Sequence, residues 1–193
     1  MFIMSNNDRP TRILDAALRV FSRYGYRRTA MDDIAREAGL SRPALYQHFR
    51  NKEDVFASLA RLVKQRTMAD MAAAWASASG VETALRAAAE AKELALYRLL
   101  HATPHGGDLL EADEGLAADL GRAMQQEAEA LIAAGLAAYG RAPGDAAALA
   151  RLFVRAAAGA KHAAEDEAAL ARDLAGLARV FAQASPGPFT PLA

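Results

Sequence analysis

The sequence contains no cysteine and a single tryptophan among its 193 residues, and aromatic residues make up only 7% of it. The absence of cysteine excludes disulfide bonds, thiol nucleophiles and cysteine-ligated zinc. No apolar run approaches the roughly 20 residues that a membrane-spanning helix needs. The first ten residues, MFIMSNNDRP, lack the basic segment and the long apolar segment of a secretory signal. We therefore expect a cytoplasmic protein with no membrane partner.

Sequence motifs of enzymatic chemistry are also missing. The chain has no phosphate-binding loop, no nucleophile motif and no Ser/His/Asp order of a catalytic triad. His101 and His105 have a spacing that would place both on one face of a helix, but Pro104 and the pair Gly106-Gly107 predict a loop. A loop does not fix the geometry of metal ligands. The sequence therefore predicts no enzyme, no metal site and no cofactor.

Charge is distributed unevenly along the chain, although the net charge is zero. Residues 1–66 hold 13 Lys and Arg against 7 Asp and Glu, and residues 67–193 hold 10 against 16. A basic N-terminal part on an acidic remainder is typical of a protein that presents one end to phosphate groups. A merely solvated charged face is the alternative interpretation.

Helical spacing and composition predict an all-α fold. Apolar residues recur at helical spacing between Thr11 and Tyr24, which predicts the first helix. From Thr67 onward, 42 of 127 residues are alanine, the best helix former, and strand signals are absent. Breaks near residues 79–80, 103–107, 140–144 and 164–167 predict four or five further helices in this part.

The segment from Thr29 to Lys52, TAMDDIAREAGLSRPALYQHFRNK, has the pattern of a helix-turn-helix, whose second helix enters the DNA major groove. Gly39 suits the left-handed conformation that ends the first of these helices. Ser41 is a favourable cap for the second, which we expect to reach about Phe49. The predicted apolar contact between the two helices consists of Ile34, Ala35, Ala38, Leu40, Leu45 and Phe49.

Two further pairs have the spacing of a capping box. Thr29 with Asp32 marks the start of the first helix of the motif, and Asn51 with Asp54 marks the start of a long helix toward Trp75. This long helix leaves the basic part of the chain and enters the acidic part. We therefore expect it to be the mechanical link between them.

Over about residues 10–56, the sequence closely resembles the DNA-binding domain of the TetR (tetracycline repressor) family of bacterial regulators. The residues that carry the resemblance are Phe21, Gly25, Tyr26, Thr29, Asp33, Ile34, Ala35, Glu37, Ala38, Gly39, Leu40, Ser41, Leu45, Tyr46, His48, Phe49, Asn51, Lys52, Glu53, Asp54 and Val55. We expect a disordered arm (1–9), a three-helix DNA-binding domain (10–56), a helical regulatory and dimerisation domain (57–184) and a flexible tail (185–193).

The first turn of the second motif helix supplies the predicted base contacts. Arg42 can donate two hydrogen bonds to guanine, Ala44 can contact a thymine methyl group, and Pro43 lies between them. Contact of Arg42 with phosphate alone is the alternative, because at least half of protein–DNA hydrogen bonds go to the backbone.

The predicted phosphate contacts follow mainly from the resemblance. It implies that Tyr46, His48 and Lys52 direct their polar ends at phosphates. Thr29 is expected to bind phosphate at the N-terminus of the first motif helix. The alternatives are a half-buried Tyr46, a surface Lys52 and a Thr29 that only caps its helix.

The C-terminal part is expected to hold a small-molecule pocket and a dimer interface, as in the TetR family. An ordinary core explains the candidate residues for either role equally well. The candidate pocket residues are Met71, Trp75, Leu94, Tyr97 and Met124. The candidate interface residues are Leu149, Phe153, Ala156, Ala160, Leu170, Leu174, Leu177 and Phe181.

The resemblance implies a homodimeric transcriptional regulator that binds a palindromic double-stranded DNA operator and is released by a small-molecule effector, as a repressor. Two alternatives remain at this point. One is a TetR-like DNA-binding protein without a ligand, such as a nucleoid or division factor. The other is a helical enzyme with an incidental helix-turn-helix.

Overall fold

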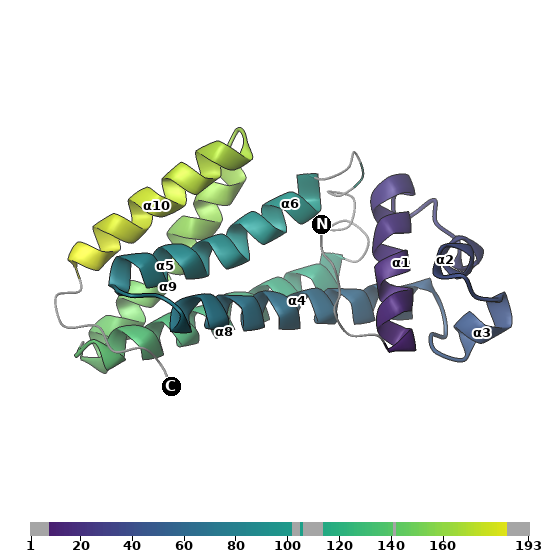
Figure 1. Ribbon diagram of the computed structural model, residues 1–193, viewed down its shortest axis with the longest axis horizontal. Helices are drawn as coiled ribbons and strands as arrows, with labels where there is room; N and C mark the ends of the chain where they lie inside the picture. Colours follow the sequence, from purple (N-terminus) through teal and green to yellow (C-terminus); the bar gives the residue numbers. More distant parts are fainter. Residues whose placement is uncertain (1–7, 102–104, 106–113, 141, 185–193) are drawn as a thin grey trace. The chain divides into compact units, whose positions relative to one another are not determined.

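The computed structural model describes residues 8–101, 105, 114–140 and 142–184 (Figure 1). These residues form helices joined by turns, which confirms the expected all-α class. None of the described helices combines the length and the apolar character needed to cross a membrane. The expected tail lies outside the described residues, as does the expected arm except for its last two residues.

The chain divides into two compact units. Unit 1 consists of Met1–Val63 with Leu99–Leu120, and unit 2 consists of Lys64–Arg98 with Gly121–Ala193. The division falls inside a long helix, after Val63, whereas the sequence placed the domain boundary after residue 56.

Unit 1 contains the three expected N-terminal helices and the start of the fourth. Asp8 caps the first helix by accepting a hydrogen bond from the Thr11 N–H at 2.9 Å, and Gly25, with φ of 80°, ends it. Asn51 Oδ1 accepts from the Asp54 N–H at 2.8 Å, which confirms one half of the predicted capping box, whereas the Asp54 carboxylate accepts from the Arg50 N–H at 3.1 Å. The helices are α1 (Arg9–Tyr24), α2 (Met31–Ala38), α3 (Arg42–Tyr46) and α4 (Lys52–Ala76).

The core of unit 1 is built around three aromatic rings. Phe21 of α1, Tyr26 of the following turn and Phe56 of α4 have ring centroids 5.1–6.3 Å apart in tilted and edge-on arrangements. Such arrangements are favourable for aromatic side chains. Ile13, Val20, Ile34, Leu45 and Val55 are buried in the same unit.

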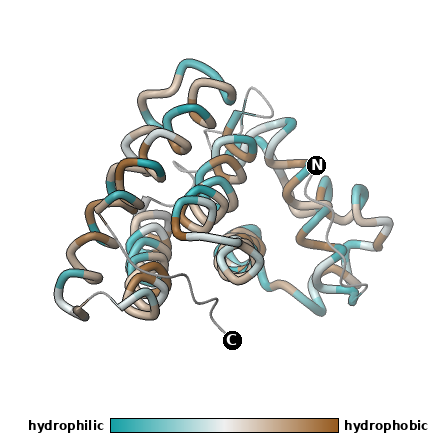
Figure 2. The backbone as a smooth tube through the Cα atoms, turned by 60° about the vertical axis from the view of Figure 1, so that its left-hand side comes forward, coloured by the Kyte–Doolittle hydropathy of each residue, from teal (hydrophilic) through white to brown (hydrophobic). Residues whose placement is uncertain are grey.

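Unit 2 is built from alanine-rich helices. Along the helices of both units, hydrophobic and hydrophilic positions alternate, as expected for elements with one buried face (Figure 2). The run from Val81 to His101 is one continuous helix containing a π-helical segment. The elements after α4 are α5 (Val81–Ala89), the π-helix η1 (Glu90–Leu94), α6 (Ala95–His101), α8 (Glu114–Ala138), α9 (Pro143–Ala163) and α10 (Glu167–Gln183).

Trp75 is the largest side chain in the core of unit 2, and it is completely buried. It depends on a glycine of α8, because a Cβ atom added at Gly135 would lie 2.2 Å from Trp75 Cζ2. The alanine-rich surroundings therefore accommodate the indole ring only where one helix lacks a side chain altogether.

We expect Gly135→Ala to destabilise the protein and Gly121→Ala, in the same helix, to leave it as stable or more stable. Overpacking a core costs about 1–3 kcal/mol, whereas alanine in place of glycine in a helix interior gains at most about 1 kcal/mol. A Cβ atom at Gly121 meets nothing within 4 Å, so Gly121→Ala gains helix propensity without a steric clash. Thermal unfolding followed by circular dichroism separates the two, and equal stabilisation by both substitutions would contradict the packing described.

Candidate nucleic-acid interface

The turn between α2 and α3 has the geometry that the sequence predicts. Gly39 has φ of 67° in the left-handed region, and its N–H donates to the carbonyl of Arg36 at 3.2 Å. The Leu40 N–H donates to the carbonyl of Ala35 at 2.9 Å. Ser41 Oγ accepts a hydrogen bond from the Ala44 N–H at 3.3 Å and thereby caps α3. These local interactions fix the direction in which α3 leaves the turn.

The helix α3 is shorter than expected, because it ends at Tyr46 instead of near Phe49. The His48 N–H bonds back three residues, to the carbonyl of Leu45 at 3.0 Å, so the chain tightens into a turn. Leu45 and Phe49 are nevertheless both buried and anchor this segment in the core of unit 1.

The opposite side of the α3 segment carries the predicted DNA contacts. Arg42, Pro43, Tyr46 and His48 are exposed, and Ala44 is half-buried. Gln47 is exposed between Tyr46 and His48, and sequence reasoning did not select it. Its amide is a hydrogen-bond donor and acceptor of the kind that reads adenine. Its position between two predicted DNA contacts is the feature of the sequence that could have identified it.

Arg42 is held by two neighbours. Its Nη1 donates to Asp32 Oδ2 at 3.3 Å, and its Nε lies 3.3 Å from Asp32 Oδ1. The Tyr46 ring lies 5.6 Å from the guanidinium carbon, within the range of a cation–π contact. Tyr46 and the Asp32 carboxylate raise the pKa of Arg42 above its ordinary value. The guanidinium therefore remains charged and is oriented at the start of α3.

Lys52, at the start of α4, is turned toward the turn that precedes α2. Its Nζ donates to the carbonyl of Tyr26 at 2.9 Å and to that of Arg27 at 3.4 Å. The ammonium also lies 4.4 Å from the centroid of the Tyr26 ring. Lys52, which the sequence predicts to contact phosphate, therefore also links α4 to the α1–α2 turn.

Thr29 is placed differently from the expectation. It is only 3% exposed, its Oγ1 donates to the carbonyl of Gly25 at 2.9 Å, and its N–H donates to the carbonyl of Tyr26 at 3.3 Å. The cap of α2 is Ala30, whose N–H donates to Asp33 Oδ2 at 2.9 Å. The predicted capping box of Thr29 is therefore wrong, and the two donors of Thr29 are used inside the turn, whereas its contact with phosphate stays a prediction.

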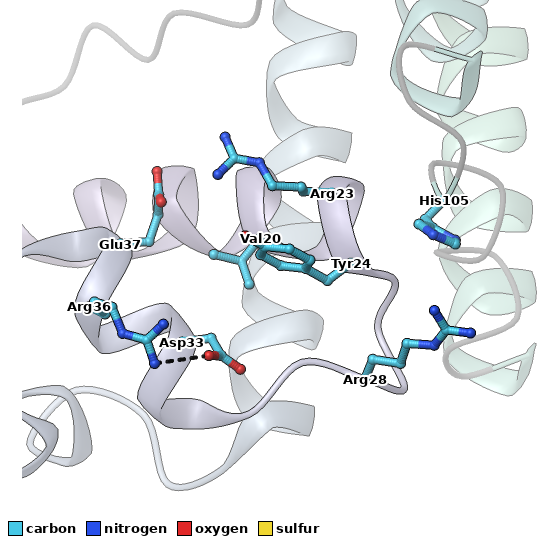
Figure 3. A pocket seen from close by; sticks show the side chains of 8 residues that line it. All are labelled: Val20, Arg23, Tyr24, Arg28, Asp33, Arg36, Glu37 and His105. Carbon is cyan, nitrogen blue, oxygen red and sulfur yellow. Dashed lines mark hydrogen bonds and ion pairs between the residues drawn. The ribbon is translucent and has the colours of Figure 1, made fainter.

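A cleft of about 520 Å³ opens beside α1 and α2 (Figure 3). Arg36 Nη2 lies 3.2 Å from Asp33 Oδ1 along one side, while Arg28 comes from the turn after α1. The lining residues are Val20, Arg23, Tyr24, Arg28, Asp33, Arg36, Glu37 and His105. The exposed arginines extend the positive charge of unit 1 beyond the α3 segment.

The candidate pocket residues all lie in the interior. Trp75 and Met71 are at most 1% exposed, and Leu94, Tyr97 and Met124 are also buried. All except Met124 belong to one hydrophobic core cluster of unit 2. Two polar atoms on the same part of α4, Thr67 Oγ1 and Trp75 Nε1, are buried without a hydrogen-bond partner among the described residues.

Charged side chains are also buried in unit 2. Glu93, in the π-helix, is 1% exposed; it forms an ion pair with Lys92, and its Oε2 lies 2.9 Å from the Nζ of Lys161 on α9. Burial alone would raise the pKa of Glu93, but the two lysines hold it below its ordinary value. Sequence reasoning missed this cluster, because Glu93 and Lys161 lie far apart in the sequence and only tertiary packing brings them together.

The residues predicted for the dimer interface fall into two groups, one buried in the core of unit 2 and one only partly buried. Leu170 and Leu174 are fully buried and Phe153 is 1% exposed, all within the core of unit 2, so these three side chains pack inside their own unit and not on its surface. Their regular spacing marks the inner face of α10 and α9. The predicted residues Leu149, Ala156, Ala160, Leu177 and Phe181 are only partly buried.

Large apolar side chains on the outer surface of α9 and α10 were not selected from the sequence. Leu152 is 56% exposed and Val180 is 63% exposed. The same two helices contain Gly159 and Gly176, where an added Cβ atom would meet nothing within 4 Å. We call Leu149, Leu152, Ala156, Leu177 and Val180 the outer apolar face.

Metal ligation finds no support in the part of the chain that the structure describes, where no group of three or more His, Asp and Glu side chains could hold an ion. His101 ends α6 and His105 lines the cleft. The loop predicted around them lies largely outside the described residues.

Comparison with known proteins identifies the class of the N-terminal domain. Residues 13–59 match the sequence profile described as bacterial regulatory proteins, tetR family. Over 47 residues the chain is 47% identical to the HTH-type transcriptional regulator AcrR of Shigella flexneri, a match that covers 24% of this chain and 22% of AcrR. Over 61 residues it is 39% identical to an HTH-type transcriptional repressor of Mycobacterium tuberculosis, covering 32% of this chain and 33% of that protein. The matches thus span at most about a third of these two relatives.

Solved structures extend the similarity to the remainder of the fold. The SmeT–triclosan complex aligns with a TM-score of 0.69 and 23% identity, covering 96% of each chain. The matched helix-turn-helix lies in the unit that presents Arg42, Tyr46 and His48, and the whole chain has the fold of TetR-like proteins. The N-terminal domain thus carries the helix-turn-helix of the tetR family of bacterial regulatory proteins, and the chain shares the fold of the SmeT structure.

Proposed function

We propose that this protein is a transcriptional repressor that binds a palindromic DNA operator as a homodimer and is released by a small molecule. The observation that carries the DNA-binding part is the α3 segment, whose one side is buried through Leu45 and Phe49 while the other exposes Arg42, Tyr46 and His48. This is the arrangement that a recognition helix needs in the major groove.

Within this proposal, the residues of the α3 segment have different tasks. Arg42, Pro43 and Ala44 stand in the first turn and read base edges, whereas Tyr46 and His48 follow on the same exposed surface and contact phosphates. Lys52 contributes in two ways: it bonds the start of α4 to the α1–α2 turn, and its ammonium adds positive charge beside the DNA backbone. The relatives matched by this domain are named as transcriptional regulators, which supports this assignment.

We expect Arg42→Ala to relax base preference and Lys52→Ala to weaken binding to all DNA. Losing a base contact costs about 1–3 kcal/mol at one base pair of each half-site. Losing a phosphate contact flattens the salt dependence by about one unit of slope and leaves the ranking of sequences unchanged. Binding measured over a panel of operator variants and salt concentrations distinguishes these effects. A uniform loss of affinity in Arg42→Ala, with the same preferred bases, would make Arg42 a phosphate ligand.

The effector site is proposed to lie beside the α4 residues Thr67, Met71 and Trp75. Residues four apart on a helix share a face, and this face carries the two buried polar atoms without a partner, Thr67 Oγ1 and Trp75 Nε1. A buried polar group without a hydrogen bond destabilises a fold by about 1–3 kcal/mol, so a ligand that bonds these atoms gains that energy. The SmeT structure, described as a triclosan complex, supports a small-molecule site in this fold.

We expect Thr67→Val to keep or slightly raise thermal stability while reducing the response to the effector. Valine has nearly the shape of threonine and removes a hydroxyl group that has no partner, so its effect on unfolding is within about 1 kcal/mol. The effector is first found by screening compounds for a rise in melting temperature together with release of bound DNA. A hit that stabilises Thr67→Val as strongly as the original protein argues against this location, and a screen without any hit favours the ligand-free alternative.

The dimer is proposed to form through the outer apolar face. Leu152 and Val180 are exposed apolar side chains that a second copy would bury, and the small residues Gly159 and Gly176 allow close approach of helices. A dimer with one helix-turn-helix per chain places two recognition helices about 34–36 Å apart on successive turns of DNA. This geometry explains why a palindromic operator is expected.

We expect the double variant Leu152→Asp with Val180→Asp to be a folded monomer that has lost operator affinity. Charges on an exposed face leave the core intact but disfavour its burial against a second copy. Leu174→Asp is the matched comparison, because it places a charge inside the core of unit 2 and should unfold the protein. Light scattering gives the mass and circular dichroism the helix content. A double variant that remains dimeric at micromolar concentration would rule out this interface.

A further inference from the structure

Asp32 is an unusual neighbour for a DNA-reading arginine. It lies in the first turn of α2 and approaches Arg42 at two points, with its Oδ2 3.3 Å from Nη1 and its Oδ1 3.3 Å from Nε. A carboxylate at this place is repelled by DNA phosphate. The resemblance to the family's motif implies no role for Asp32.

The stability of the fold does not explain this ion pair. The side chains of Arg42 and Asp32 are 62% and 53% exposed, and ion pairs at such exposure contribute little to folding. Asp32 does not cap α2 either, because the carboxylate that bonds the cap residue Ala30 belongs to Asp33. The contact therefore acts mainly on the orientation and charge of Arg42.

The geometry leaves part of the guanidinium available. Asp32 lies against Nη1 and Nε, and the Tyr46 ring lies 5.6 Å from the guanidinium carbon. Arginine carries several N–H donors in a planar fork, and the contacts with Asp32 involve Nη1 and Nε, which leaves Nη2 outside this ion pair. An arginine reads guanine through two N–H groups directed at the acceptors O6 and N7. A long side chain that is already oriented loses less freedom when it makes these bonds.

We propose that Asp32 is a specificity-determining residue that positions Arg42 for reading a guanine and at the same time disfavours docking of Arg42 onto phosphate. Phosphate competes for the same N–H groups, and the nearby carboxylate repels the phosphate charge while it tolerates the neutral base edge. Selectivity is the ratio of specific to non-specific affinity. Asp32 raises that ratio by lowering the non-specific affinity. This inference rests on the proposed DNA-binding function.

The test uses the full-length protein and selection of binding sites from a randomised double-stranded DNA library, followed by affinity measurements on the selected site and on random DNA. We expect Asp32→Asn to reduce the preference at one base pair of each half-site by about 3–10-fold, a part of what a lost bidentate contact costs. We also expect it to bind random DNA more tightly at low salt, with the gain fading as salt is raised.

The matched control is Glu37→Gln, which removes one negative charge from the same unit. Glu37 accepts a hydrogen bond from Arg19 Nε at 2.6 Å, whereas the carboxylate that bonds Arg42 is that of Asp32. We expect this variant to bind random DNA somewhat more tightly and to keep the base preferences of the original protein. The double variant Asp32→Asn with Arg42→Ala should have the base preferences of Arg42→Ala alone, because Asp32 acts through Arg42.

Two outcomes would overturn the inference. If Asp32→Asn behaves like Glu37→Gln, with unchanged base preferences, Asp32 is only a negative charge. If its change of preference persists in the Arg42→Ala background, Asp32 contacts a base itself. Failure of the underlying function looks different, because the original protein would then select no sequence from the library at all.

Discussion

The α3 helix spans only Arg42–Tyr46, and a helix of this length is not stable in isolation. Its position depends on the burial of Leu45 within it and of Phe49 just after it, both in the core of unit 1. Gly39 and Ser41 set the direction of the chain as it enters the helix. Because the apolar side is fixed in this way, the polar side chains on the other surface have a defined direction toward a ligand.

The α4 helix connects this surface to the remainder of the chain. It begins at Lys52, whose ammonium is bonded to the carbonyls of the α1–α2 turn, and it ends at Ala76 in unit 2. Phe56, one helical turn after Lys52, packs against Phe21 and Tyr26. A shift of the start of α4 therefore strains hydrogen bonds and aromatic contacts within unit 1. An effector that binds the α4 residues of unit 2 would act along this continuous helix, provided that it binds one state of the protein more tightly than the other.

Unit 2 combines a small-residue core with buried polarity. Alanine supplies helix propensity and close packing but little apolar area, and Trp75, the largest core side chain, packs against α8 at Gly135, where that helix has no side chain. The Lys92, Glu93 and Lys161 cluster adds an interaction between the π-helix and α9. Buried ion pairs rarely stabilise a fold more than apolar residues of the same size, and π-helical segments are frequent at functional sites.

Much of the secondary structure of this protein can be predicted from its sequence, because it depends on local interactions. The left-handed Gly39, the caps at Ser41 and Asn51 and the all-helical class follow from interactions within a few residues of one another. The inward direction of Thr29, Leu174 and Glu93, the contact of Lys52 with a turn 25 residues earlier and the placement of Asp32 against Arg42 do not follow from the sequence. These features depend on which side of each helix meets another element. A helical stripe looks the same in sequence whether it faces its own core or a partner, and only tertiary packing distinguishes the two.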